Sequence, residues 1–385
     1  MDFRFDPETE RFRSEVRAFL AEAMRGAADH CDSNDLTGLD REFGRALHRR
    51  AGERGWLDLH GEQRAVFECE VARADAPLID TAMTLAGHAI TTFGSSRHAA
   101  LLAQMLAGEV EMCIAYTEAA AGSDLAAITT SAGRDGERWS LTGHKVLVTG
   151  AMKAEWCLTI ARTAADAKPS DAFTMFLVDM RSPGVRVEPR PTMNGWALGD
   201  ITFDDVHLGH DDVVGVVGAG WRQMAAAVDA ERSGMFWLGF ARHVLDLLVD
   251  HVLTGLRSGA PLVSDPIARD SVARCAIEVE AVERLTRRAM WTTLTSGTDP
   301  ALNAMVKIAA TEVLQMLAQT STELSGRAGT LWAPLFGDAP PGAAGGGRFA
   351  WEYLERVHGT ISVGANELQR DTVAALALGL TGSAR

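Results

Sequence analysis

The sequence has few cysteines, and their arrangement indicates neither a disulfide framework nor a metal site. The five cysteines are an odd number and form no CxxC or Cys/His spacing; they are Cys31, Cys69, Cys113, Cys157 and Cys275. Disulfide frameworks and zinc sites need paired or closely spaced residues. We therefore expect free thiols in a reducing compartment and no bound metal.

Basic charge is also scarce, with 37 Lys and Arg against 51 Asp and Glu, a formal charge of −14. A nucleic-acid-binding protein needs a concentrated basic surface for its phosphate contacts, so we expect no nucleic-acid partner. No run approaches ~18 uncharged apolar residues, which predicts no membrane span. Residues 1–10 are polar and acidic, unlike a signal peptide, and a cytoplasmic location is expected.

The sequence does have a large apolar fraction, because 47% of the 385 residues are hydrophobic. That is enough for more than one core. Helical spacing at both ends of the chain and strand-like alternation between them predict an α+β fold that is mainly α. We expect an N-terminal helical domain over 1–112, a middle antiparallel β-barrel or sandwich domain over 113–218, and a C-terminal helical bundle domain over 219–385.

The N-terminal part is expected to begin with a helix at Pro7, with Asp6 as its cap. Further N-terminal helices are predicted over 41–54, 65–74, 80–93 and 98–106. In the C-terminal part, the spacing and the Asp-Pro and glycine boundaries predict helices over 221–253, 266–296, 300–326 and 366–380.

Short runs of β-forming residues predict the strands of the middle domain, over 113–117, 139–142, 145–148, 157–160, 173–178, 185–187 and 201–206. Gly143 and His144 separate two of these runs, so we expect a tight hairpin there.

The loop that follows the first predicted strand is the most informative local feature. Its sequence, Tyr116 to Asp124, is YTEAAAGSD. Small residues let a backbone approach a ligand closely, and the hydroxyls of Thr117 and Ser123 can hold a phosphate or the edge of a heterocycle. An ordinary turn has the same composition, so both interpretations stay open.

Glu231 lies on an otherwise apolar stripe of the predicted helix over 221–253, together with Met224, Val228 and Met235. Desolvation raises the pKa of a carboxyl group toward the value wanted in a general base. Arg232 beside it can bind an anionic or carbonyl ligand. A surface glutamate paired with an arginine is the alternative.

A glycine-containing turn from Gly364 precedes the last predicted helix. The start of a helix offers backbone N–H groups and the positive end of its dipole to an anion, although many helices begin this way without a ligand. The histidines form no i,i+4 pair of metal ligands.

Together these segments resemble the acyl-CoA dehydrogenase family, FAD-dependent enzymes that place a double bond between the α and β carbons of an acyl thioester. The loop from Tyr116 resembles the family's TEPxAGSD motif, and Gly143 to Thr149 resembles NGxKxWIT. The segment from Phe203 to Arg232 is similar to FDDVxVP…ER, and Ile361 to Arg370 is similar to the late GGTxEIQR motif. The motifs span nearly the whole chain, and the family's C-terminal domain is a four-helix bundle.

The resemblance implies an FAD site between the β-domain and the bundle. The cofactor-binding residues would be Tyr116, Thr117, Gly122, Ser123, Val148, Thr149, Gly364 and Glu367. It also implies an acyl thioester substrate carried by CoA or an acyl carrier protein, and an electron-transfer flavoprotein or another acceptor. The assembly would be a homo-oligomer or a heteromer with a paralogue.

The departures from the family pattern matter for the catalytic prediction. Val363 stands where many members carry the catalytic glutamate, and it keeps only a backbone N–H for the thioester oxygen. Some members carry the base on the long helix instead. We therefore predict that Glu231 takes the α-proton and that Arg232 and Val363 contact the substrate.

Two further departures favour a different interpretation. Leu147 replaces the family's tryptophan beside the flavin. In the RxxFG segment, which contacts a neighbour's flavin, Gly255 and Ser258 stand at the arginine and phenylalanine positions. The alternative function is therefore a catalytically impaired subunit of a heteromeric complex.

Overall fold

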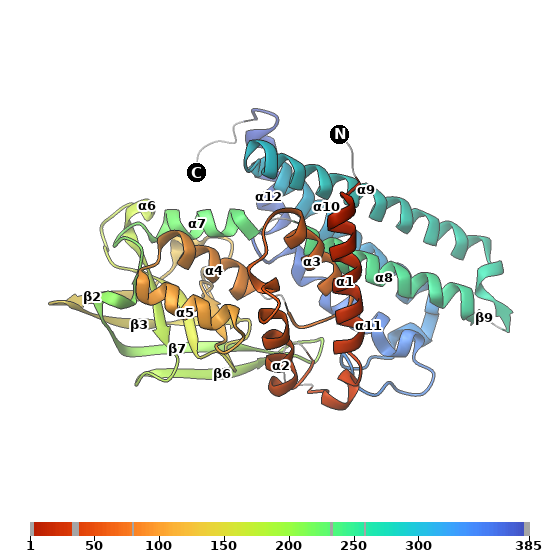
Figure 1. Ribbon diagram of the computed structural model, residues 1–385, viewed down its shortest axis with the longest axis horizontal. Coiled ribbons are helices and arrows are strands. Elements are labelled where there is room, and N and C mark those ends of the chain that lie inside the picture. Colours follow the sequence, from red (N-terminus) through yellow and green to blue (C-terminus); the bar gives the residue numbers. More distant parts are fainter. Residues whose placement is uncertain (1–3, 33–37, 79–80, 232–233, 258, 381–385) are drawn as a thin grey trace.

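The computed structural model describes residues 4–32, 38–78, 81–231, 234–257 and 259–380. A sheet with short helices beside it forms one half of the molecule, and long helices form the other half (Figure 1). The expected fold class, mainly helical with a central β-domain between helical regions, is confirmed.

Five helices precede the sheet, and the first begins where its cap predicts. The Asp6 carboxylate accepts a hydrogen bond of 2.7 Å from the Thr9 N–H, and Pro7 opens the helix. The five are α1 (Pro7–Ala23), α2 (Arg41–Gly52), α3 (Gly61–Arg73), α4 (Thr81–Phe93) and α5 (Ser96–Leu106).

The central sheet has eight strands in the order β6-β7-β3-β2-β4-β5-β8, with β1 paired to β4. The short helix α6 (Pro169–Ala172) lies directly before β5. The strands are β1 (Met112–Ala115), β2 (Ser131–Asp135), β3 (Arg138–Val148), β4 (Trp156–Arg162), β5 (Phe173–Asp179), β6 (Val185–Pro191), β7 (Ala197–Leu208) and β8 (Val213–Val214).

The sheet corrects three expectations. It is mixed, because β1 pairs with β4 in parallel, Cys113 opposite Cys157. The hairpin expected at Gly143 and His144 is wrong, since β3 runs through both residues, and β2, which no sequence run indicated, pairs with it. Only glycine fits at position 143, because a Cβ there would come within 2.2 Å of the Thr130 Oγ1 atom.

The C-terminal helices are α7 (Gly220–Glu231), α8 (Met235–Thr254), α9 (Pro266–Ser296), α10 (Pro300–Ser325), α11 (Arg348–Glu355) and α12 (Asn366–Leu376). The short hairpin of β9 (Leu256–Arg257) and β10 (Ala260–Pro261) joins α8 to α9. Short 3-10 helices elsewhere in the chain are Ala27–His30, Trp56–Asp58, Leu125–Ala127, His210–Asp212, Leu262–Ser264, Gly326–Thr330, Ala344–Gly347 and His358–Thr360.

The prediction of a single helix over 221–253 is wrong, because α7 ends at Glu231 and α8 begins at Met235. Gly234 precedes α8 with a φ of 76°, in the left-handed region. A Cβ at this position would come within 2.2 Å of the Val306 Cγ1 atom on α10. Gly234 therefore packs tightly against α10, and the apolar stripe around Glu231 belongs to two helices.

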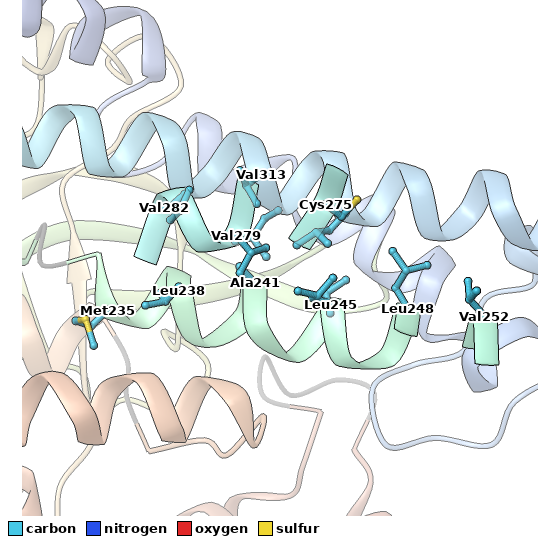
Figure 2. Packing of buried hydrophobic residues seen from close by; sticks show 14 of the residues in the cluster. Met235, Leu238, Ala241, Leu245, Leu248, Val252, Cys275, Val279, Val282 and Val313 are labelled. Carbon is cyan, nitrogen blue, oxygen red and sulfur yellow. The ribbon is translucent and has the colours of Figure 1, made fainter. Parts of the chain in front are cut away.

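The bundle core forms where α8, α9 and α10 meet. Leu238, Ala241 and Leu245 of α8 point toward Val279 and Val282 of α9 (Figure 2). Burying a side chain of the size of valine or leucine contributes about 1.5–3 kcal/mol. Val313 of α10 belongs to the same cluster, so this apolar core holds α8, α9 and α10 together.

One described helical segment, Pro300–Thr330, is long and apolar enough to cross a membrane by length and composition, and 67% of its most apolar window is buried inside the fold. It includes α10, which lies against α8, α9 and α12. The apolar character of α10 is that of a core helix in contact with several others.

Candidate functional site

The loop after β1 closes on itself and presents small residues outward. The backbones of Glu118 and Ala121 exchange two hydrogen bonds, of 3.1 and 3.0 Å. Tyr116 is buried, whereas Gly122 and Ser123 are exposed. A Cβ built on Gly122 meets no atom within 4 Å, so a ligand can reach the backbone there.

Glu118 anchors this loop from within. Its carboxylate accepts hydrogen bonds from the Thr129 N–H (2.8 Å), the Thr129 hydroxyl (2.7 Å) and the Thr130 N–H (2.9 Å), and from the Lys145 Nζ (3.0 Å). Burial raises the pKa of this carboxyl group, but the hydrogen bonds and the Lys145 charge together lower it to about 2. Glu118 is therefore an anion throughout the physiological range.

The end of β3 lies beside the loop, because the Val146 N–H donates to the Thr117 carbonyl at 3.0 Å. The strand is irregular here. Leu147 has a φ of 58° and is 51% exposed, and its N–H donates to the Asp200 carboxylate at 3.1 Å. Val148 packs its side chain into the β-domain core, so any flavin contact it makes is through its backbone.

These residues fit a flavin cofactor. FAD carries phosphates, hydroxyls and a flat heterocycle, which need backbone access, hydroxyl donors and an apolar wall. The open backbone at Gly122, the exposed side chains of Ser123 and Thr149 and the exposed Leu147 side chain supply these features. Thr117 contributes its carbonyl to the anchoring of the loop.

The late turn is strained and is held from α10. Val363 and Gly364 have consecutive positive φ values of 53° and 85°, and a β-branched residue rarely adopts this conformation. Lys307, only 2% exposed, donates to the Gly364 carbonyl at 2.9 Å and to the Asn366 side chain at 2.7 Å. Gln369 donates to the same Gly364 carbonyl at 3.3 Å.

The candidate base lies at the end of α7. The helix ends at Glu231, whose side chain, like the whole of Arg232, lies outside the described residues. Gly234 packs against Val306, the residue before Lys307. Gly234 and the turn at Val363 and Gly364 thus both contact the same stretch of α10, at Val306 and Lys307.

Glu367, the remaining cofactor candidate, is exposed in the first turn of α12. Glu118, Lys145 and Lys307 are structural anchors that the sequence interpretation did not identify. The available signal was a lysine next to a short apolar run, as Lys145 precedes Val146–Val148 in β3 and Lys307 lies between Val306 and Ile308 in α10.

The segment that departs from the RxxFG pattern forms the β9–β10 hairpin at one end of the bundle (Figure 1). Its surroundings are apolar, since Leu253, Leu256 and Ile267 are each more than 60% exposed. Ser258 lies outside the described residues. All five cysteines are free thiols, and no cluster of metal-ligating side chains occurs among the described residues.

Comparison with known families agrees with this architecture. The acyl-CoA dehydrogenase middle domain matches residues 113–206, and the acyl-CoA dehydrogenase C-terminal domain matches residues 218–378. Together the two matches cover more than half of the sequence and define a flavoprotein oxidoreductase. The chain belongs to the acyl-CoA dehydrogenase family.

Several known proteins are similar to this chain over nearly its full length. Acyl-CoA dehydrogenase IpdE1 of Mycobacterium tuberculosis is 28% identical, over 98% of this chain and 99% of that protein. A solved structure described as Tcur3481-Tcur3483 steroid ACAD is 25% identical with a TM-score of 0.88, and the match covers 100% of both chains. Butyryl-CoA dehydrogenase from Megasphaera elsdenii, at 18% identity and a TM-score of 0.84, shares the fold over 98% of this chain and 100% of its own.

Acyl-CoA dehydrogenases are FAD-dependent oxidoreductases of lipid metabolism. Family membership therefore confirms FAD as the expected cofactor and places the chain in a family whose members are oxidoreductases.

Proposed function

We propose that this protein catalyses the FAD-dependent α,β-dehydrogenation of an acyl thioester, with Glu231 as the base. The observation that carries the proposal is the absence of a carboxylate at Val363, where many members carry the base. It is combined with the position of Gly234, which packs against Val306, the neighbour of the Lys307 that holds the turn at Gly364. Some family members without that glutamate carry the base on the long helix, where this chain has Glu231.

Each residue of the site has a distinct part. Glu231 takes the α-proton of the thioester, and the Val363 N–H donates to the thioester oxygen, where negative charge develops. Arg232 contacts the substrate. The loop from Tyr116 to Ser123, the β3 end at Val148 and Thr149, and Gly364 and Glu367 hold the cofactor. FAD, when bound, supplies the acceptor for the β-hydride.

We propose a bulky, ring-bearing acyl group as the substrate class. Support comes from the full-length similarity to a structure described as a steroid ACAD. The carrier is CoA or an acyl carrier protein, and an electron-transfer flavoprotein or an equivalent acceptor reoxidises the cofactor.

The test compares Glu231→Gln with Glu188→Gln, a control at an exposed position on β6. Glutamine keeps the shape of glutamate and removes its basicity. With a steroid-derived acyl-CoA as the substrate, we expect flavin reduction by Glu231→Gln to fall by a factor of roughly 100 or more at unchanged FAD content. The control should match the parent. Flavin reduction at the parent rate in Glu231→Gln would refute the assignment of the base.

A second candidate function is a catalytically impaired subunit in a heteromer with a paralogue. It is favoured by the apolar β9–β10 end, where Leu253, Leu256 and Ile267 are exposed. It is also favoured by Gly255, which stands where the resemblance places the arginine that contacts a neighbour's flavin. The visible absorption spectrum of the protein expressed alone separates the two functions. A yellow protein with bound flavin supports the enzyme, and a colourless protein supports the impaired subunit.

A further inference from the structure

The β-domain contains a buried ion pair beneath the candidate flavin loop. Lys145 is fully buried and Glu118 is 7% exposed, and their charged atoms lie 3.0 Å apart. Lys145 comes from β3, whereas Glu118 belongs to the loop after β1. Neither side chain reaches the surface on which Gly122 and Ser123 are exposed.

Stability alone is a weak explanation for this pair. Burying two charges costs desolvation energy that their mutual attraction roughly offsets, so a well-packed apolar pair often serves as well. What two buried charges do supply is geometry, since each needs its hydrogen bonds satisfied in fixed directions. Glu118 and Lys145 are both buried, and both have hydrogen-bond partners in fixed directions.

The pair joins three separate segments of the chain. The Lys145 Nζ donates to the Tyr116 carbonyl at 3.1 Å and to the Glu118 carboxylate at 3.0 Å. The other bonds to that carboxylate come from Thr129 and Thr130. The start of the loop and the segment that follows it are therefore both tied to β3.

The exposed part of the loop lies between these two anchored ends. Gly122 is open to solvent. The next side-chain bond along the loop is local, from the Ala126 N–H to the Asp124 carboxylate at 3.2 Å. The position of the exposed backbone is consequently fixed by the hydrogen bonds at Tyr116, Glu118 and Thr129.

We propose that the Lys145–Glu118 pair is the positioning device of the cofactor site, which holds the loop from Tyr116 to Ser123 in the shape that binds FAD without touching FAD itself. The inference rests on the proposed function only in placing FAD at this loop. Lys145 and Glu118 are thus positioning residues. Loss of the pair should therefore weaken FAD binding even in a variant whose unfolding midpoint is close to that of the parent.

The experiment titrates FAD into apo-protein, follows the quenching of flavin fluorescence, and records the thermal unfolding midpoint of each apo-protein. The variants are Glu118→Gln, Lys145→Met and the double variant. The control is Arg186→Met, which removes an exposed ion pair with Asp204 in the same domain. We expect at least a tenfold loss of FAD affinity in each single variant and no change in the control.

The double variant separates positioning from stability. It leaves no unpaired buried charge, so its unfolding midpoint should recover toward the parent value. Its FAD affinity should remain at least tenfold weaker, because the side-chain bonds from Lys145 to the Tyr116 carbonyl and to residue 118 are still missing, and the Val146–Thr117 backbone bond alone then ties the loop to β3. FAD affinity at the parent level in the double variant would overturn the inference. Affinity would then follow the unfolding midpoint, as expected if the pair only stabilises the fold.

This titration measures cofactor binding and not dehydrogenation, so the two proposals can fail separately. A parent protein that binds FAD but does not oxidise acyl thioesters would refute the proposed function and leave the positioning role testable by the same variants. A parent protein that binds no FAD would refute both.

Discussion

Replacing Gly234 by alanine tests the packing of the junction that follows Glu231. The φ of 76° costs an L-residue about 1–2 kcal/mol, of which the reduced freedom of the unfolded chain returns about 0.4–1 kcal/mol. The new Cβ would also lie 2.2 Å from the Val306 Cγ1 atom in the buried core of α10, and overpacking of this kind costs about 1–3 kcal/mol. We expect a total loss of about 1–4 kcal/mol.

The matched control is Gly136→Ala, in the turn between β2 and β3. Gly136 has a φ of 59°, and a Cβ built there meets no atom within 4 Å. It therefore carries the backbone strain without the clash, and it should cost about 1 kcal/mol or less. Urea unfolding of both variants gives the difference that belongs to packing against Val306.

A combined Gly234→Ala, Val306→Ala variant adds a second check, because removing the Val306 methyl groups opens the space that the new Cβ needs. The coupling between the two changes should be favourable. If Gly234→Ala unfolds at the same urea concentration as Gly136→Ala, or if Val306→Ala gives no favourable coupling, the tight packing of this junction on α10 is refuted.

Two further predictions concern the cofactor and the assembly. Ser123→Ala should weaken FAD binding by about 0.5–3 kcal/mol, the range for one lost hydrogen bond, and unchanged affinity in a fluorescence titration would remove Ser123 from the site. The chain should also self-associate to a multiple of 41.3 kDa, because α9, α10 and α12 enclose an apolar groove of about 630 Å³ lined in part by Val282, Ile308 and Met316. Ile308→Glu should shift the mass measured by light scattering toward 41.3 kDa, and a parent that is monomeric at all concentrations would contradict this.

Features that depend on neighbouring residues could be predicted from the amino-acid sequence. Asp6 and Asp265 cap the helices that begin at Pro7 and Pro266, and both boundaries lie where the sequence predicted them. The same holds for α10, which begins at Pro300 after Asp299. Caps and prolines act within one turn of a helix, so their effect is readable from the local sequence.

The order of helical and β segments was also readable, because hydrophobic period is a local property. Together with the motifs from Tyr116 to Arg370, that order was enough to indicate the family, which the comparisons confirm. The site residues themselves, with Glu231 first among them, stay predictions.

Features that depend on contacts between distant segments could not be predicted in this way. The sequence predicts a turn at Gly143, but β3 continues through this residue. Glycine is needed there because Thr130 leaves no room for a Cβ. The helix over 221–253 looked continuous but breaks at Gly234, where α10 packs against it. Glycine permits either outcome, and the neighbour that selects between them is far away in the chain.

The buried charges follow the same rule. Lys145 and Glu118 are 27 residues apart in the sequence, and Lys307 lies 57 residues before Gly364. A charged side chain in an apolar segment predicts that some partner exists, since an unpaired buried charge is too costly to keep. Which partner it finds, and which turn or loop it then holds, depends on how the strands and helices pack.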